Sequence, residues 1–179
     1  MKIIFYISAV AALVGCASAA PSLPTQANVD LNKYTGTWYE QARLPNSFQR
    51  DCASDVRADY TLQPGNTIKV VNQCKQKDGS VKIAQAEGRL AANATAPDFS
   101  KLQVRFAPKW TSWLPMVWGD YWIMKIHGDY KYSLVGTPNR QFLWVLSREK
   151  QADERVVNEL LAYAANHGFA VQDITRTSQ

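Results

Sequence analysis

The stretch Asp55-Val56-Arg57-Ala58-Asp59-Tyr60 alternates charged and apolar residues without interruption. Because successive side chains of a β-strand point to opposite faces, this order predicts a strand with one solvated face and one buried face. Val56, Ala58 and Tyr60 are therefore expected to point inward.

The same period of two continues on both sides of this stretch. One strand is expected before it, from Gly36 to about Arg43, and further strands are expected at 66–72, 80–90, 101–106, 121–126, 130–136 and 142–147. In the strand at 101–106, Leu102, Val104 and Phe106 share one face. The strands are separated by turn signals, among them Pro64-Gly65 and Asp78-Gly79.

About eight strands in succession, joined by short turns, favour an antiparallel up-and-down β-barrel, because closure removes the exposed sheet edges. A barrel of that size encloses room for one small ligand. A β-sandwich is the alternative architecture, and the regular hairpin rhythm argues against it.

One helix is expected near the end of the chain, from Asp153 to Asn166. Its apolar residues recur at helical spacing and Gly168 follows as a C-cap. A short final strand is expected at 170–175. The predicted fold class is thus all-β, an eight-stranded antiparallel barrel with one C-terminal α-helix.

The N-terminus has the form of a secretory signal, with Lys2 before a short apolar run, and we assign residues 1–15 to it. It ends in Leu13-Val14-Gly15-Cys16, which resembles the lipobox of bacterial lipoproteins and implies that Cys16 becomes the lipidated first residue. The alternative is cleavage nearby, for example after Ala20, with Cys16 discarded. By the same resemblance, Ala17 favours an anchor in the outer membrane, on its periplasmic side.

Residues 16–29 are expected to be the lipidated N-terminus and a tether, and residues 30–179 one barrel domain. The full chain carries 20 Lys and Arg against 15 Asp and Glu, and its cations are scattered. Because nucleic-acid binding favours a basic stripe or patch, this distribution argues against such a partner.

Cys52 and Cys74 form an even pair in a chain that we expect to be exported, which points to a disulfide. Two free thiols are the alternative. If the bridge forms, strand counting places both cysteines at the same end of the barrel.

Catalysis finds little support in the residue pattern. His127 and His167 are the only histidines, and neither has the spacing of a metal site or a catalytic triad. We expect no catalytic residues, no metal and no cofactor, and we expect that the protein is not an enzyme.

Three ordered motifs carry a resemblance to a known family. Gly36-Thr37-Trp38 looks like the G-x-W signature of the lipocalins, Gly128-Asp129-Tyr130 resembles their second region, and the strand ending at Arg148 resembles the third. Within the family, the chain is most similar to the bacterial lipoprotein lipocalins related to apolipoprotein D, from about Val29 to Thr175.

The resemblance implies that Trp38 lies across the closed end of the barrel, with the Arg148 guanidinium stacked on it. Gly36, Asp129 and Tyr130 belong to the same end. The alternative is that Trp38 is an ordinary core aromatic and Arg148 an exposed cation.

The loop before the sixth strand is unusually aromatic, since it contains Trp110 and Trp113 and is followed by Trp118. Such a patch marks a ligand entrance or a membrane contact if it is exposed. The alternative is that the three side chains fold inward as core.

The expected function is binding, storage or transport of a small apolar ligand such as a fatty acid or lysophospholipid. The expected ligand contacts are Val56, Ala58, Tyr60, Leu102, Val104, Phe106, Trp110, Trp113 and Trp118. A membrane contact through the N-terminal lipid and a homodimer are the other expected associations. Two alternatives stay open: a lipid-modifying enzyme on a similar barrel, and a structural envelope protein with a filled interior.

Overall fold

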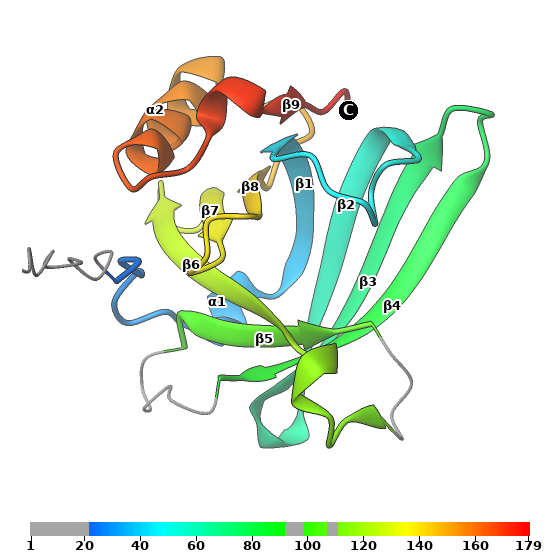
Figure 1. The fold of residues 1–179 in the computed structure, drawn as a ribbon, viewed down its shortest axis with the longest axis vertical. Coiled ribbons are helices and arrows are strands. Elements are labelled where there is room, and N and C mark those ends of the chain that lie inside the picture. Colours follow the sequence, from blue (N-terminus) through cyan, green and yellow to red (C-terminus); the bar gives the residue numbers. More distant parts are fainter. Residues whose placement is uncertain (1–21, 92–98, 107–110) are drawn as a thin grey trace, which may run out of the picture.

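The computed structural model describes residues 22–91, 99–106 and 111–179. It has a closed barrel of eight antiparallel strands with one long helix on its outside (Figure 1). The predicted fold class is confirmed. In the described part of the chain, no helix is long and apolar enough to cross a membrane. The barrel strands are β1 (Gly36–Arg43), β2 (Cys52–Gln63), β3 (Thr67–Gln76), β4 (Val81–Leu90), β5 (Lys101–Arg105), β6 (Gly119–His127), β7 (Tyr132–Gly136) and β8 (Leu143–Ser147).

The remaining elements are short apart from one helix. They are α1 (Leu31–Tyr34), α2 (Glu154–Ala165), β9 (Thr175–Arg176) and the 3₁₀ turns η1 (Pro64–Asn66), η3 (Pro115–Val117) and η4 (Val171–Asp173). We call the end of the barrel with the β1–β2, β3–β4, β5–β6 and β7–β8 connections the mouth. The opposite end, where α1 lies before β1, is the closed end.

The barrel closes because β1 pairs on one edge with β8 and on the other with β2. The β1–β2 pairing covers only the first half of β1, from Gly36 to Tyr39. Nearer the mouth, β9 pairs with the end of β1, and Ser178 of the C-terminal tail forms a bridge to Ser54 of β2. The tail therefore fills the seam between β1 and β2 where these two strands diverge (Figure 1).

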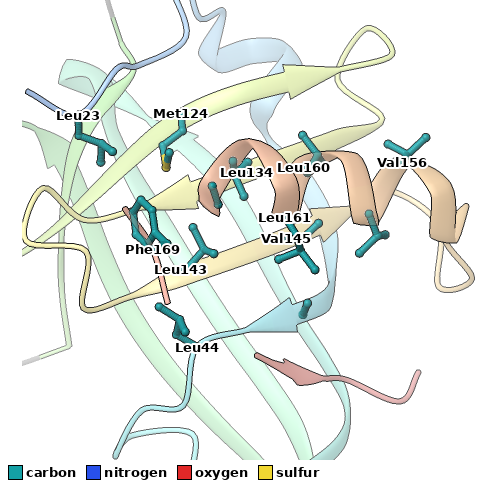
Figure 2. Packing of buried hydrophobic residues seen from close by; sticks show 13 residues of the cluster. Leu23, Leu44, Met124, Leu134, Leu143, Val145, Val156, Leu160, Leu161 and Phe169 are labelled. Atoms are coloured by element: carbon teal, nitrogen blue, oxygen red, sulfur yellow. The ribbon is translucent and has the colours of Figure 1, made fainter. Parts of the chain in front are cut away.

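Helix α2 packs against the outside of the barrel. It begins after Asp153, whose side chain accepts a hydrogen bond from the backbone N–H of Arg155 and caps the helix. Its apolar face shares a core with strand residues and with the segment after the helix (Figure 2). This outer core consists of Leu23, Ala42, Leu44, Met124, Leu134, Leu143, Val145, Val156, Val157, Leu160, Leu161, Ala164 and Phe169.

A second buried cluster fills the closed half of the barrel interior. It combines residues of α1 with inward-facing residues of most strands, so the first and last barrel strands contribute to one core. Its members are Val29, Leu31, Tyr34, Trp38, Ala58, Tyr60, Ile68, Val70, Leu102, Ile123, Val135 and Leu146.

Three local predictions differ from the structure. Residues 22–29, expected as part of a tether, pack on the barrel, since Leu23 and Val29 are buried and the Gln26 N–H donates to the Ile123 carbonyl at 2.9 Å. Strand β7 begins at Tyr132 rather than Tyr130, because residues 128–130 all have positive φ and form the turn. The final strand lies at Thr175–Arg176, and η4 occupies the preceding segment.

Candidate functional site

The closed end is plugged by a stacked tryptophan and arginine. Trp38 is fully buried, and its Nε1 donates to the Tyr34 carbonyl at 2.8 Å. The Arg148 Cζ lies 3.8 Å from the centre of the Trp38 ring, within the range of a cation–π contact. The guanidinium also donates to the carbonyl oxygens of Lys33, Thr37 and Tyr130, at 2.6, 2.9 and 3.2 Å.

The other residues expected at this end lie around the same pair. Gly36 has φ +94°, and a Cβ there would come within 3.3 Å of Arg148 Nη1, so both conformation and space favour glycine. The Tyr130 hydroxyl accepts from the Asp30 N–H at 2.7 Å, and the Asp129 carboxylate accepts from Lys33 Nζ at 3.1 Å. These contacts tie α1 to the β6–β7 turn, so the group is structural rather than catalytic.

A cluster of hydroxyl groups lies above the plug. The Tyr121 hydroxyl is 3.0 Å from those of Tyr34 and Tyr60, and the Tyr34 hydroxyl is 2.9 Å from Ser133 Oγ. Only Tyr60 was named as a site residue from the sequence. The period-two pattern of β6 could have indicated that Tyr121 faces inward, but not which hydroxyl it meets.

Burial dominates the ionisation of these tyrosines. It raises the pKa of Tyr34 from 10.0 to about 12, although the hydrogen bonds from Ser133 and Tyr121 oppose the shift. Burial likewise raises the pKa of Tyr60 and that of Tyr121. The floor of the interior is therefore neutral at physiological pH and offers hydroxyl groups without a charge.

The expected wall residues differ in burial. Val56, Ala58, Tyr60 and Leu102 are buried, and the last three belong to the interior cluster. Val104 is half-buried. Phe106, expected on the same face as Leu102, is 52% exposed and lies just beyond the end of β5.

Asn72 of β3 also faces the interior, which the sequence analysis missed. It stands directly opposite Ala58 on β2 and Ala84 on β4, and Ala58 in turn stands opposite Trp38. Residues opposite each other across antiparallel strands share a face. The Asn72 Oδ1 is buried and has no hydrogen-bond partner among the described residues. Between two alanines, this oxygen is an acceptor available to a ligand.

The mouth contains a buried ion pair. Glu40 Oε1 lies 2.5 Å from Arg43 Nη1, and both residues are buried. The same carboxylate accepts from Thr177 Oγ1 at 2.6 Å and from Gln49 Nε2 at 2.6 Å. Thr177 belongs to the C-terminal tail and Gln49 to the β1–β2 loop. Glu40 is therefore held by hydrogen bonds rather than left as a free acid or base.

The β1–β2 loop is tied down across the mouth. Gln49 Oε1 accepts from Trp144 Nε1 at 2.9 Å, and Lys82 Nζ of β4 donates to the Phe48 carbonyl at 3.2 Å. The predicted disulfide between Cys52 and Cys74 is confirmed, with a Cα–Cα distance of 5.5 Å. It joins the start of β2 to the mouth end of β3.

The two described tryptophans of the β5–β6 connection lie in different surroundings. Trp113 is 75% exposed. Trp118 packs against Arg89, whose Cζ lies 3.8 Å from its ring centre, and against Arg105 at 5.1 Å. Leu102 belongs to the interior cluster, and Leu90, which stands opposite it, packs against that cluster. Arg89 is next to Leu90 and Arg105 is three residues after Leu102, so by strand alternation both point to the outer face. Trp118 therefore covers the outer wall, which corrects its prediction as a ligand contact. Trp110 lies outside the described residues.

The hollows at the described surface include two that are lined by strand residues. One of about 540 Å³ is lined by Gln63, Pro64, Thr67, Ile68, Lys69, Gln85, Ala86, Glu87 and Arg105. The other, of about 310 Å³, is lined by Tyr39, Asp55, Arg57, Gln73, Cys74, Lys75, Val81, Lys150 and Gln179. Neither is lined by Val56, Ala58 or Leu102. The apolar floor is packed with side chains. Asn72 and Ala84 are half-buried nearer the mouth, and they also line neither of these two hollows.

The remaining titratable groups do not form a catalytic arrangement in the described part of the chain. Glu87 Oε2 accepts from Arg105 Nη2 at 2.6 Å. His167 Nδ1 lies 2.7 Å from the Tyr163 carbonyl, on the outer helix. No group of three or more His, Cys, Asp or Glu that could hold a metal occurs among the described residues.

A barrel plugged at one end, with apolar residues and a neutral polar floor inside, defines a class of small-ligand carriers. The family model described as a lipocalin-like domain matches residues 29–179. The chain belongs to the lipocalin family, whose members bind small hydrophobic ligands. The family expected from the three sequence motifs is confirmed.

Named relatives agree with this assignment. Temperature-induced lipocalin-1 of Arabidopsis thaliana is 36% identical over 152 residues, covering 84% of this chain and 80% of the relative. Outer membrane lipoprotein Blc of Escherichia coli strain K12 is 32% identical over 161 residues, covering 89% and 85%. Among solved structures, insecticyanin of the tobacco hornworm Manduca sexta superposes with a TM-score of 0.68 at 19% identity, covering 90% of this chain and 86% of that one. This last likeness concerns the fold alone.

Proposed function

We propose that this protein is a membrane-anchored lipocalin that binds, stores or transports a fatty acid or lysophospholipid in the cell envelope. The observation that carries the proposal is the inward face at mid-barrel, where Asn72 presents a buried, unpartnered oxygen between Ala58 and Ala84. In this proposal an acyl chain lies against these small side chains, and the oxygen accepts a hydrogen bond from a ligand hydroxyl such as that of a lysophospholipid.

The acyl chain contributes most of the binding free energy in this proposal. Removing apolar surface from water contributes roughly 25 cal/mol per Å². Its contacts are the expected wall residues that face the interior, above all Val104 and the mouth side of Tyr60. Phe106 and Trp113 are proposed to meet the ligand at the entrance, as is Trp110.

A pair of variants on one strand tests the site. Ala84→Trp places a large ring on the inward face, and Ile83→Trp places the same ring on the outward face, where Ile83 is already 61% exposed. Titration of a fluorescent fatty acid and of lysophosphatidylcholine in detergent-free buffer should show saturable binding to the wild type and to Ile83→Trp. Ala84→Trp should bind at least about tenfold more weakly, because steric exclusion removes apolar burial. Equal binding by both variants would place the ligand elsewhere.

The membrane anchor is proposed to be a lipid on Cys16, with residues 1–15 removed as a signal peptide. The lipobox-like Leu13-Val14-Gly15-Cys16 supports it, as does the name outer membrane lipoprotein carried by the relatives from Escherichia coli and Citrobacter freundii. We also propose a location on the periplasmic side of the bacterial outer membrane, which the same likeness supports. Cys16→Ala should move the protein from the membrane fraction to the soluble fraction, and retention in membranes would contradict the anchor.

We further propose that the protein acts without turning its ligand over. The interior carboxylate of Glu40 is engaged by Arg43, Gln49 and Thr177, which leaves it poorly placed as a general base. Native mass spectrometry of the protein purified from its membrane should find an intact amphiphile. The same spectra report the oligomeric state, for which a homodimer is proposed.

A further inference from the structure

The most exposed large apolar side chains of the described residues lie in one short segment. Met116 is 85% exposed and Trp113 is 75% exposed. Both belong to the connection between β5 and β6, within the stretch Thr111–Val117 that ends in η3. We call this stretch the apolar loop. Leaving a Trp and a Met in water forgoes the free energy that their burial would release.

Their exposure does not result from a loose conformation. Inside the loop, the Leu114 N–H donates to the Thr111 carbonyl at 2.9 Å, and the Trp118 indole N–H donates to the Ser112 carbonyl at 2.8 Å. Trp118 is in turn stacked on the outward-facing Arg89. These contacts hold the base of the loop on the barrel wall, while the side chains of Trp113 and Met116 extend into solvent.

The chemistry of the loop favours a lipid surface as its partner. The segment 111–118 has no charged residue. Its single most exposed aromatic is tryptophan, which is favoured where an apolar phase meets water. On the neighbouring outer wall, the buried Arg105 is paired with Glu87, which leaves the cations Arg89 and Lys101 beside the acid Asp120. The whole chain has a formal net charge of +5. An uncharged apolar tip beside an excess of cations is complementary to an anionic bilayer surface.

We propose that the apolar loop is a membrane-docking element, which inserts Trp113 and Met116 into the interfacial layer of an anionic phospholipid bilayer. The loop belongs to the mouth end, so docking brings the entrance of the barrel to the lipids. The idea that docking serves ligand exchange with the bilayer rests on the proposed carrier function. The docking itself does not depend on it.

The experiment uses the full chain carrying Cys16→Ala, so that no covalent lipid contributes. Its partition onto vesicles of phosphatidylethanolamine and phosphatidylglycerol is measured by co-sedimentation. Replacing Trp113 and Met116 together by Ser should lower the partition coefficient about tenfold. This decrease corresponds to only part of the free energy that full burial of two large apolar side chains would contribute. The matched control replaces Val81 and Ile83 by Ser, since these residues are 60% and 61% exposed on β4, and it should bind like the parent.

Two further measurements separate the outcomes. Binding of a fluorescent fatty acid without vesicles is measured on the parent and on the Val81 and Ile83 control, because Trp113 is itself a proposed ligand contact. Absence of binding by both proteins would contradict the carrier function and leave docking standing. An unchanged partition after the Trp113 and Met116 replacements would overturn the docking proposal. The oligomeric state of the same variant is measured by analytical ultracentrifugation. A change from dimer to monomer together with an unchanged vesicle partition would also overturn the proposal, and would assign the loop to a contact between two copies.

Discussion

The two ends of the barrel are stabilised by different chemistry. The closed end consists of a fully buried Trp38, the stacked Arg148 and a set of neutral hydroxyls. The mouth contains a buried ion pair, Glu40 with Arg43, completed by a residue of the C-terminal tail. Burial of a large aromatic is strongly favourable, whereas a buried ion pair roughly offsets its own desolvation cost. The comparison teaches that the closed end supplies stability, and that the mouth is held in shape by matched polar partners.

The largest expected effect is at the closed end. Trp38→Ala removes a fully buried ring and the surface on which Arg148 stacks, and should lower the free energy of unfolding by about 3–5 kcal/mol. Trp144→Ala changes a half-buried tryptophan at the mouth and should lower the free energy of unfolding clearly less. Urea unfolding followed by circular dichroism measures both. Equal costs would break the proposed difference between the two ends.

Alkaline pH should weaken the closed end next. The Tyr34 hydroxyl stays protonated in the folded state up to a pKa of about 12, whereas in the unfolded chain it ionises near 10.0. The unfolded state therefore binds fewer protons between these values, and stability falls as pH rises from about 10 towards 12. The difference is worth about 2–3 kcal/mol for this group. Thermal unfolding across that window should show the loss. Tyr34→Phe should reduce its slope without abolishing it, because the pKa values of Tyr60 and Tyr121 are raised as well. An unchanged slope in the variant would assign the loss to other groups.

The smallest expected effect is at the mouth. Thr177→Val keeps the shape of the side chain but removes the hydroxyl that donates to Glu40, so it should cost about 1–2 kcal/mol. Thr175→Val, at an exposed position of the same tail, is the matched control and should be nearly neutral. A Thr177→Val variant as stable as the control would show that the tail contact does not support the ion pair.

Much of the closed end was predictable because its residues lie in short sequence motifs that resemble those of the lipocalins. The plug was expected through the resemblance of Gly36-Thr37-Trp38 and Arg148 to lipocalin motifs, and in the structure Arg148 lies against both Gly36 and Trp38. The Cys52–Cys74 bridge followed from cysteine number and strand order. Trp118 was predicted incorrectly, because periodicity does not extend through a loop and the arginines that bind its ring lie on other strands.

By itself, the sequence determined the alternation of the strands, the amphipathic helix on the outside and the residues that face inward on β2. These features depend on neighbours within a few positions, where the geometry of strand and helix relates spacing to direction. Only the tertiary structure decided that the tail enters the seam between β1 and β2 and that Leu23 joins the outer core. It also decided that the Tyr121 hydroxyl is hydrogen-bonded to those of Tyr34 and Tyr60. Such partners are far apart along the chain, and closure of the barrel brings them together.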